Sequence, residues 1–523
     1  MQKSKCESGV RLGVFLAFCI LTFASTSCER SEQRSDPNVI TVAVRNPPNN
    51  LDPRIANDET SSRLGQLVFS SLTDLGDDLR ARPTLAESIE NPDPLIWIVR
   101  LRRGVKFHDG EELTSEDVVF TFGKLIDPVF VSPYKGAYRM LASVRPLDTY
   151  TVEFTLKEPF VSFAEQLTTP PVVPAHRADS LSREPVGTGP YRFVRYDTDD
   201  QVVLAAFEDY FEGRPNNSGI ILKIVPDDTI RALELRKGSV DIVINQLPPD
   251  IVHQFEESGE LQVIPSSGLD FMYVGVNMRD PVLSDKRVRH AIGYAINRQA
   301  IVDHLRRGLA RVAQGPLIPP QVWAFEPAVH RFDYDPERAI GLLEEAGYRD
   351  PDGDGPLQRV RLTLKVSNIE EFVLQATVIQ QDLRRVGIDV DVRSYEFATF
   401  FADVVNGNVQ LYAMQWVGGA VADPDMLRRV FHSQQIPPAG FNRGRYINPQ
   451  VDRLLDLATR SLVESERRKY YSDVQKLVAE DAPYIPLWNR TNAIVARRDL
   501  TGLHLNAIGA YQSLKDVRRV ALN

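Results

Sequence analysis

Strand-like and helix-like segments alternate along almost the whole chain, and this alternation constrains the fold more than any other feature. Ile220–Ile244 is the clearest example: a β-rich run is followed by a helix over Thr229–Lys237, closed by Gly238, and then by a short strand from Val240. Such strand–helix–strand units place strands side by side in a sheet, with helices packed on its faces. The chain is therefore predicted to be an α/β protein with mixed sheets.

Capping signals mark where several helices begin. Thr114 and Asp117 form a capping box, and Asp335–Pro336 supplies an N-cap with proline at the first helical position. Glu464–Glu480 predicts a last long helix. After Asp285, another helix buries one apolar stripe, and the basic residues of its other face are expected to be solvated or, alternatively, to contact a membrane partner. These residues are Lys286, Arg287, Arg289 and His290.

The N-terminus has the anatomy of an export signal. Lys3, Lys5 and Arg11 precede the apolar run Leu12–Phe23, and small residues lead from this run to Cys28. The run is too short for a comfortable membrane span of about 20 residues. We predict a signal peptide over residues 1–27.

Cys28 follows small residues as in a bacterial lipobox, although Ser25 stands where leucine is usual. We predict that Cys28 is lipidated, and that the polar residues 28–38 form a tether between the membrane and the fold. The mature protein would then lie in the periplasm or at the cell exterior, anchored to the membrane as a lipoprotein. An ordinary secreted protein and an uncleaved anchor are the alternatives.

Composition and motifs argue against an enzyme, a nucleic-acid-binding protein or a metalloprotein. All three cysteines lie in the first 28 residues, so the body of the chain offers no disulfide, thiolate metal site or cysteine nucleophile. The net charge is −9, without a basic patch for nucleic acid. The body also lacks a P-loop, a nucleophile elbow and a Rossmann fingerprint. We expect no catalytic residues, no metal and no cofactor.

Two local patterns suggest chemistry but are interpreted as structural. His108–Asp109 has the composition of half a catalytic dyad, yet its turn chemistry predicts a structural role. Asp350–Gly355 resembles the first half of an EF-hand loop, but Arg361 occupies the position of the bidentate acid. A surface turn is predicted there, with a weak Ca²⁺ site as the alternative.

The segment Trp97–Phe122 (WIVRLRRGVKFHDGEELTSEDVVFTF) and several shorter ones carry a family resemblance. The shorter segments are Leu51–Pro53, Pro83–Glu87, Gly187–Phe193, Gly238–Ile242, Asp285–Asn297, Asp335–Tyr348, Asn448–Asp452 and Ala482–Trp488. In this order, and over residues 39–490, they resemble the family-5 extracellular solute-binding proteins, which are the oligopeptide, dipeptide and nickel binders of ABC importers.

The resemblance implies a periplasmic-binding-protein-like type II fold (class C), in which three domains build two lobes around a hinge and an interlobe cleft. The implied boundaries are residues 39–50, 183–270 and 489–523 for a discontinuous domain I, 51–182 for the family's extra domain II, and 271–488 for domain III. The crossovers near Asp270 and Trp488 would form the hinge. The predicted first strand and its expected sheet partners are far apart in the sequence, as a large domain inserted between them would require.

The resemblance also places a ligand site in Gln415–Asp425. Family peptide binders carry a Trp-x-x-Asp segment here; its Asp meets the free ammonium of the peptide, and neighbouring backbone pairs with the peptide like an added strand. In this chain Gly419 stands at the acid position after Trp416, and Asp423 follows later. Either Asp423 has taken the role or the ligand has no N-terminal amine. Gly418 and Gly419 would let the backbone approach a ligand closely; a plain loop with Trp416 in the core is the alternative.

Three further residues are candidate ligand contacts by their position in the family: Asp58 and Glu59, in a polar loop, and Tyr273, near a crossover. A solvated loop and a core position are the alternatives. The implied function is that of the substrate-binding lipoprotein of an ABC importer, a monomer that works with permease subunits and captures a small solute, which we predict to be an oligopeptide. The alternatives are a family member that binds an oligosaccharide or a chelated metal, and a ligand-sensing receptor without transport.

Overall fold

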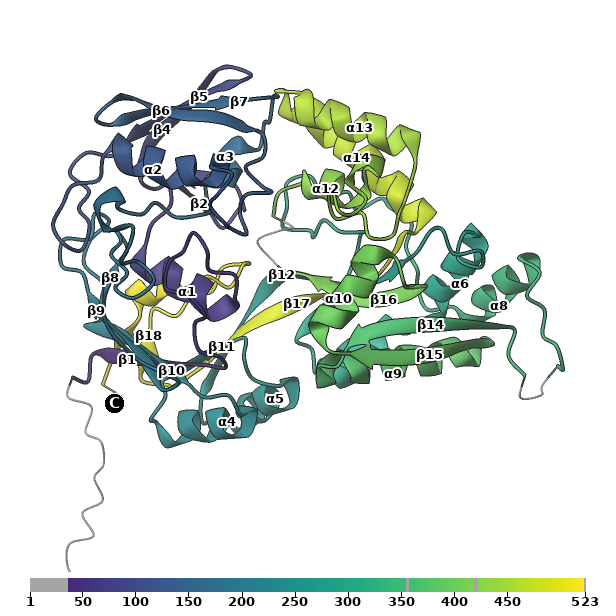
Figure 1. Ribbon diagram of the computed structural model, residues 1–523. Coiled ribbons are helices and arrows are strands. Elements are labelled where there is room, and N and C mark those ends of the chain that lie inside the picture. The colour runs from purple at the N-terminus through teal and green to yellow at the C-terminus, as the bar shows by residue number, and fades with distance from the viewer. Residues whose placement is uncertain (1–35, 354–356, 418–421, 522–523) are drawn as a thin grey trace, which may run out of the picture.

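The computed structural model describes residues 36–353, 357–417 and 422–521. These residues form two lobes joined by two long strands, β12 (Gln262–Val276) and β17 (Tyr484–Ala496), which cross the centre of the molecule in Figure 1. The two strands pair antiparallel along most of their length, from one lobe into the other. Both lobes combine a sheet with packed helices, so the predicted α/β class is confirmed.

The first lobe is built around β1 (Val39–Val44). This strand is almost completely buried and lies between two parallel neighbours, with Val39 opposite Gly219 and Val42 opposite Ile242. A strand that is covered on both faces needs the continuous apolar run that this segment has. The other elements of the lobe are β8 (Tyr191–Asp197), β9 (Gln201–Ala206), β10 (Gly219–Ile224), α4 (Asp228–Lys237), β11 (Ile242–Ile244), α5 (Pro249–Ser258), β18 (Leu500–Thr501) and β19 (Arg518–Arg519).

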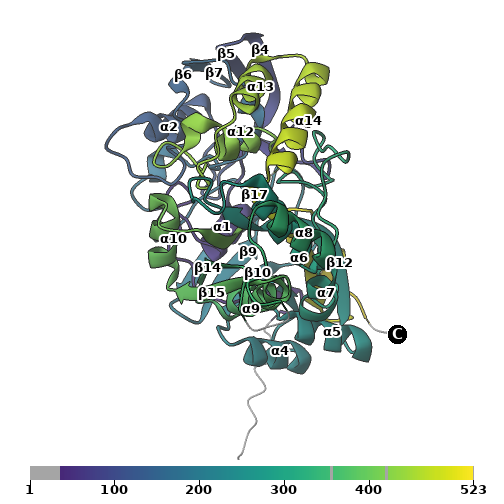
Figure 2. The same ribbon diagram turned by 90° about the vertical axis from the view of Figure 1, so that its right-hand side faces the viewer.

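The second lobe continues the same sheet and adds two groups of helices. Figure 2 shows one group, α12, α13 and α14, at the top and the other, with α6, α8 and α9, below it. The elements of this lobe are α6 (Lys286–Ala295), α7 (Arg298–Ala300), β13 (Ala310–Val312), α8 (Pro336–Glu345), β14 (Val360–Ser367), α9 (Glu370–Arg385), β15 (Ile388–Tyr395), α10 (Phe397–Asn406), β16 (Leu411–Trp416), α12 (Met426–Phe431), α13 (Pro449–Arg460) and α14 (Glu464–Asp481).

A single eleven-stranded mixed sheet passes through both lobes. Its order is β15-β14-β16-β12-β17-β11-β1-β10-β9-β8, with β13 added beside β17. Where the sheet passes between the lobes, the β12–β17 register shifts between Ser267 and Phe271 and again between Met272 and Tyr273. Such irregularities bend a strand and interrupt its ladder.

A large insertion follows β1 and forms the upper left of Figure 1. Its four-stranded antiparallel sheet has the order β4-β5-β7-β6 and packs with α2 around Phe107, Phe122 and Phe154. Gly187 and Gly189, where the chain returns, have no room for a side chain, because a Cβ on Gly187 would lie 2.1 Å from the Val68 carbonyl oxygen. The elements are α1 (Glu59–Val68), β2 (Thr73–Leu75), β3 (Ala81–Pro83), β4 (Ala86–Asp93), β5 (Ile96–Leu101), α2 (Ser115–Ile126), β6 (Leu141–Asp148), β7 (Thr151–Leu156) and α3 (Phe163–Gln166).

The capping signals in the sequence predicted helix ends correctly. The capping box of Thr114 and Asp117 opens α2, and the Asp335 side chain accepts a hydrogen bond at the start of α8. Gly238 ends α4 with a φ of 85°. That left-handed conformation is accessible to glycine at little cost, so a single residue defines the turn between α4 and β11.

The expectation of a solvated basic face on α6 is wrong for two of its residues. Arg289 and His290 are only 4% and 7% exposed. Arg289 Nε donates to the Asp481 carbonyl at 2.8 Å, and His290 Nε2 lies 2.7 Å from the Glu480 carbonyl oxygen. The last carbonyls of a helix such as α14 have no intrahelical partners, so buried basic side chains are stable beside them.

Candidate functional site

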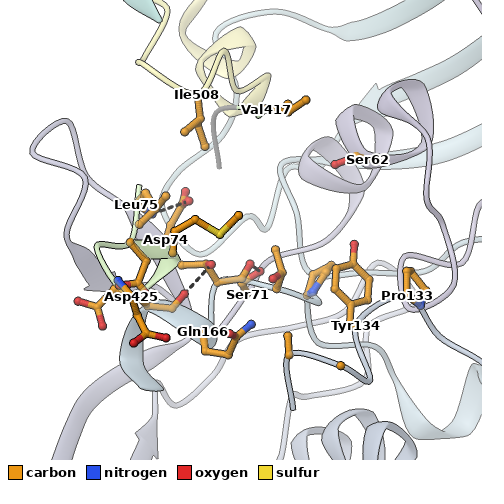
Figure 3. Close-up of a pocket in the computed structure, with 18 of the residues that line it drawn as sticks. Ser62, Ser71, Asp74, Leu75, Pro133, Tyr134, Gln166, Val417, Asp425 and Ile508 are labelled. Carbon is orange, nitrogen blue, oxygen red and sulfur yellow. Dashed lines mark hydrogen bonds between the residues drawn. The ribbon is translucent and has the colours of Figure 1, made fainter. Parts of the chain in front are cut away.

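A cleft of about 1980 Å³ lies between the two lobes. Helix α1 and loops of the insertion line one side, and the end of β16 and the start of α12 line the other. Figure 3 shows Asp74, Tyr134 and Gln166 of the insertion in the same pocket as Asp425 of the second lobe. The volume exceeds the roughly 300–1,000 Å³ of sites for drug-sized ligands, so the cleft has room for an extended ligand.

Trp416 forms an aromatic wall of this cleft at the end of β16. It lines the cleft but is only 7% exposed, because other side chains pack around its ring. The Phe441 ring lies 5.6 Å away, and the Arg443 guanidinium lies 4.7 Å from the ring centroid. Arg443 is itself 6% exposed and forms no ion pair with any described residue. The cation–π contact between Arg443 and Trp416 therefore helps to hold the Trp416 ring in place.

Tyr273 lies behind this wall and does not line the cleft, so its prediction as a cleft residue is wrong. It is completely buried and stacks on Tyr484 at a centroid distance of 3.9 Å and on Trp416 at 6.4 Å. Successive side chains of a strand point to opposite faces, and Tyr273 shares the core-facing side of β12 with Phe271. Its role is to support Trp416.

Asp423 lies in the cleft as part of a carboxylate cluster. Its Oδ1 accepts hydrogen bonds from Ser162 Oγ of the insertion and from the Asp425 backbone N–H, both at 3.0 Å. Burial, with repulsion from Asp425 and Glu165, raises the pKa of Asp423 to about 7. Burial also raises the pKa of Glu165. A cationic group bound here would stabilise the ionised form of Asp423.

Asp58 and Glu59 lie at the start of α1, on the opposite side of the cleft, and both line it. Asp58 is the N-cap of α1, since its side chain accepts from the Ser61 N–H at 2.9 Å and from the Asn49 N–H at 3.2 Å. The Glu59 side chain is 56% exposed and lies 3.9 Å from Arg63 Nε. The Asp58 carboxylate is thus already used to cap the helix, whereas the carboxylate oxygens of Glu59 remain available to a ligand.

Three predicted residues lie outside the described part of the chain. Gly418 and Gly419 fall in residues 418–421, and Cys28 falls in residues 1–35. Asp354 and Gly355 of the half EF-hand pattern also lie outside it. Among the described residues, no group of three or more His, Cys, Asp and Glu side chains is placed to hold a metal ion. No described helix is long and apolar enough to cross a membrane.

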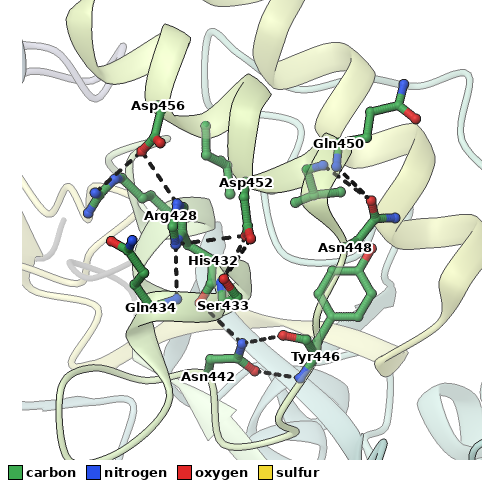
Figure 4. Close-up of polar contacts among 12 residues, drawn as sticks. Arg428, His432, Ser433, Gln434, Asn442, Tyr446, Asn448, Gln450, Asp452 and Asp456 are labelled. Atoms are coloured by element: carbon green, nitrogen blue, oxygen red, sulfur yellow. Dashed lines mark hydrogen bonds and ion pairs between the residues drawn. The ribbon is translucent and has the colours of Figure 1, made fainter.

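A polar network that no sequence pattern predicted lies behind the second-lobe wall (Figure 4). Arg428 and Asp456 both line the cleft, and their side chains lie 3.5 Å apart. His432, which is 3% exposed, has Nε2 at 3.4 Å from Asp456, and its Nδ1 accepts from the Gln434 N–H at 3.1 Å. No local pattern marks this network, because α12, the loop after it and α13 each supply part of it.

His108 is structural, as predicted, and connects two of the segments that carry the family resemblance. Its Nε2 lies 3.0 Å from the Gly189 carbonyl oxygen, and its Nδ1 accepts from the Gly187 N–H at 3.3 Å. Burial lowers the pKa of His108 to about 4. Asp109 pairs instead with His176, at 2.9 Å.

Comparison with known proteins agrees with a two-lobed binding protein. The family model of the bacterial extracellular solute-binding proteins, family 5 (middle region), matches residues 80–438. The oligopeptide-binding protein AppA of Bacillus subtilis (strain 168) is 29% identical to this chain over 94% of each protein. The glutathione-binding protein GsiB of Pectobacterium atrosepticum is 30% identical over 89% of this chain and 91% of its own length.

Two solved structures extend the comparison to the fold. AppA from Bacillus subtilis in complex with a nonapeptide aligns with a TM-score of 0.77 at 27% identity, covering 92% of this chain and 99% of AppA. NikZ from Campylobacter jejuni in complex with Ni(L-His) aligns with a TM-score of 0.78 at 26% identity and the same coverage. The type II periplasmic-binding-protein fold is thereby confirmed, and these relatives bind solutes and are not enzymes. The chain belongs to the bacterial extracellular solute-binding proteins of family 5.

Proposed function

We propose that this protein is the substrate-binding subunit of an ABC importer and that it captures small peptides with a free N-terminal ammonium by closing its lobes. The carboxylate cluster around Asp423 carries the proposal. An ammonium between Asp423, Asp425 and Glu165 would relieve the repulsion among these groups and replace the water that burial removes. Asp423 would thus supply the acid that is missing at Gly419.

The rest of the cleft supports a peptide rather than a smaller solute. The volume of about 1980 Å³ leaves room for several residues beyond the ammonium. Trp416 offers an apolar face for side chains, and we propose that the backbone at Gly418 and Gly419 approaches the ligand closely. Asp58 and Glu59 would face the same ligand from α1, with Glu59 the more available. AppA and GsiB, by their names, bind peptides or a peptide derivative.

A chelated metal is the second candidate, since one observation favours it. Gly419 stands where the family's peptide binders carry the ammonium-binding Asp, and NikZ binds Ni(L-His) on the same fold. A metal-chelate ligand would colour the purified protein, whereas most peptides would not. A binding protein that presents its closed form to a signalling receptor would have the same cleft, and neighbouring permease and ATPase genes would favour import.

We further propose the anchoring and the hinge as the sequence predicts them. Lipidation of Cys28 would hold the protein at the membrane, beside permease subunits, as a monomer at the periplasmic or outer face. Incorporation of labelled palmitate that Cys28→Ala abolishes would test this. The hinge would lie near Asp270 and Trp488, and the domain boundaries would be those that the family resemblance implies. The register shifts of β12 beside Asp270 support it, because a bulged ladder bends more easily than a regular one.

A thermal-shift screen of the chain from Glu29 onward tests the proposed function. The panel contains di- to pentapeptides, their N-acetylated forms, oligosaccharides and nickel chelates. A ligand at about 100 times its dissociation constant stabilises the folded state by about 2.7 kcal/mol. We expect a shift with free-amine peptides that acetylation abolishes. A shift with chelates or sugars alone would contradict the peptide proposal and favour the second candidate.

A further inference from the structure

We propose that the first lobe carries a carboxylate-binding subsite, built from Arg490 and Arg63 on a platform of two asparagines, so that the substrates are zwitterions held at both ends. This inference rests on the proposed function, because it concerns the other end of the same ligand. It predicts that a free ligand carboxylate contributes to affinity as much as the free ammonium does.

Arg490 supplies the first positive charge. It lies on β17 where this strand leaves the hinge, is partly buried and lines the cleft. One N–H of its Nη2 donates to the Asn245 carbonyl at 2.5 Å. No carboxylate of the described residues lies within 4.0 Å of this guanidinium, and its remaining N–H groups have no hydrogen-bond acceptor among those residues. A ligand oxygen would therefore not have to displace an existing ion pair.

Arg63 supplies the second positive charge from α1. Its side chain is 13% exposed and lines the cleft. Nη2 donates to the Ile508 carbonyl at 3.1 Å, and the guanidinium lies 5.5 Å from the Tyr511 ring centroid. Ile508 is labelled in Figure 3 and shows where this corner of the pocket lies. Glu59, at 3.9 Å, is the carboxylate nearest to Arg63 and is half exposed, so it neutralises the charge only in part.

Gly509 lies where Arg63 approaches the two asparagines. A Cβ built on this glycine would lie 3.0 Å from Asn245 Nδ2, 3.4 Å from Arg63 Nη2 and 3.8 Å from Asn492 Oδ1. Its φ of +67° also disfavours any other residue. Glycine therefore leaves the backbone without a side chain at the point where the Arg63 guanidinium and the amides of Asn245 and Asn492 meet.

Asn245 connects the two arginines through this platform. Its carbonyl holds Arg490, its Nδ2 donates to Asn492 Oδ1 at 3.0 Å, and its Oδ1 accepts from the Ala493 N–H at 2.9 Å. Asn245 has a φ of 59°, in the left-handed region that non-glycine residues rarely adopt. Such backbone strain persists where surrounding contacts impose it, and it is concentrated at functional sites.

The ligand class follows from the charges at the two ends. Guanidinium groups match the planar geometry of a carboxylate and can bind it through paired hydrogen bonds. The second lobe presents Asp423 and Asp425 to the cleft, with Glu165 of the insertion near them, and Arg63 and Arg490 line the same cleft from α1 and β17. A ligand with an ammonium at one end and a carboxylate at the other complements both lobes and favours their closure around it.

Isothermal titration calorimetry tests the subsite with di- to pentaalanine, each as the free acid and as the C-terminal amide. The proteins are the wild type, Arg490→Met, Arg63→Met and the control Arg311→Met. Arg311 lies on β13 beside β17, is exposed and does not line the cleft. For the wild type we expect the amide to bind about 10- to 100-fold more weakly than the acid. Arg490→Met should weaken binding of the free acid by a similar factor and leave the affinity for the amide unchanged. Arg311→Met should change neither affinity.

Several outcomes would overturn the inference, and they differ from failure of the proposed function. If the wild type binds the acid and the amide equally, the subsite is refuted while peptide binding stands. If Arg490→Met and Arg63→Met weaken both forms alike, the arginines do not recognise the terminal carboxylate. If inorganic phosphate stabilises the wild type but not Arg490→Met, and the acid is not preferred, the subsite binds phosphate. If neither form binds the wild type, the proposed function and the inference fail together.

Discussion

Among single residues, Asp423 should make ligand affinity depend on pH. Burial and its acidic neighbours raise its pKa to about 7, so the empty folded protein holds a proton here that the unfolded chain releases near pH 4. The contribution of this group to folding stability is therefore lost as the pH rises from about 4 to about 7. A bound ammonium favours the ionised carboxylate, so affinity for free-amine peptides should fall below neutral pH, by up to about tenfold per pH unit.

Calorimetric titrations between about pH 5 and about pH 8 would measure this dependence. Asp423→Asn removes the titrating group, so its affinity for the same peptides should be lower at neutral pH and nearly constant across the range. N-acetylated peptides are the matched ligand control, since they bring no ammonium to the cluster. A wild-type affinity that does not change with pH would refute the assignment of Asp423 as the ammonium acceptor.

Trp416 combines a binding role with a packing role, and substitutions should separate the two. Trp416→Ala removes the cleft wall but also empties the space between Phe441 and Arg443, so we expect a loss of roughly 3–5 kcal/mol in stability as well as weaker peptide binding. Trp416→Phe keeps a ring there and should retain most of the stability while it weakens binding several-fold. Unchanged affinity of Trp416→Phe and Trp416→Ala in calorimetry would exclude Trp416 from the ligand site.

At the scale of elements, substitution by alanine at two glycines with similar sequence surroundings should change the stability of the protein in opposite directions. Gly275 on β12 faces Tyr412 on β16, and a Cβ there would lie 2.1 Å from the tyrosine ring. Gly275→Ala should therefore destabilise the protein by about 1–3 kcal/mol through overpacking. Gly341 lies within α8 with no atom within 4 Å of its would-be Cβ, so Gly341→Ala should stabilise the protein by about 0.5–1 kcal/mol. Thermal unfolding of both variants would measure the two changes in stability, and changes of the same sign would refute the packing argument.

The sequence predicts elements well where local chemistry decides them. The apolar run Val39–Val44 coincides with β1, and Gly238 ends α4 as expected, because an apolar run and a helix-terminating glycine act within a few residues. β12 differs: only Phe271–Val276 (FMYVGV) has the composition of a strand, yet the strand begins at Gln262. Its first half includes the polar stretch Ser266–Gly268, which pairs with β17 without an alternating pattern. Pairing across a distance of more than 200 residues leaves no local signal in the sequence.

For the whole molecule, the site was predictable only where the family resemblance supplied it. Trp416 and Asp423 line the cleft and lie near one motif. Arg63, Asn245 and Arg490 also line it, but no motif marks them, because they come from α1, a turn after β11 and β17, which are far apart in the sequence. Burial likewise moved Tyr273 from the expected cleft into the core, since strand pleating and not proximity to the crossover decides which side chains face the ligand.

The two lobes are also joined by an ion pair at the edge of the cleft, which should favour the closed state. Arg80, between β2 and β3, contacts Glu464 at the start of α14 with both forks of its guanidinium, at 2.7 and 2.9 Å. The side chains are 44% and 52% exposed, so the pair contributes only about 0.2–1 kcal/mol. If the pair forms only on closure, Glu464→Gln should raise the ligand dissociation rate, and weaken affinity, by roughly 1.5- to 5-fold.

Stopped-flow dissociation of a bound peptide would measure this effect, which should shrink at high salt because exposed charges are screened. Glu208→Gln is the matched control: its pair with Arg214 is also largely exposed but lies within one lobe, so the dissociation rate should not change. A double-mutant cycle with Arg80→Gln separates the pair from either side chain alone. Additive effects of Arg80→Gln and Glu464→Gln, or an equal effect of Glu208→Gln, would show that lobe closure does not depend on this contact.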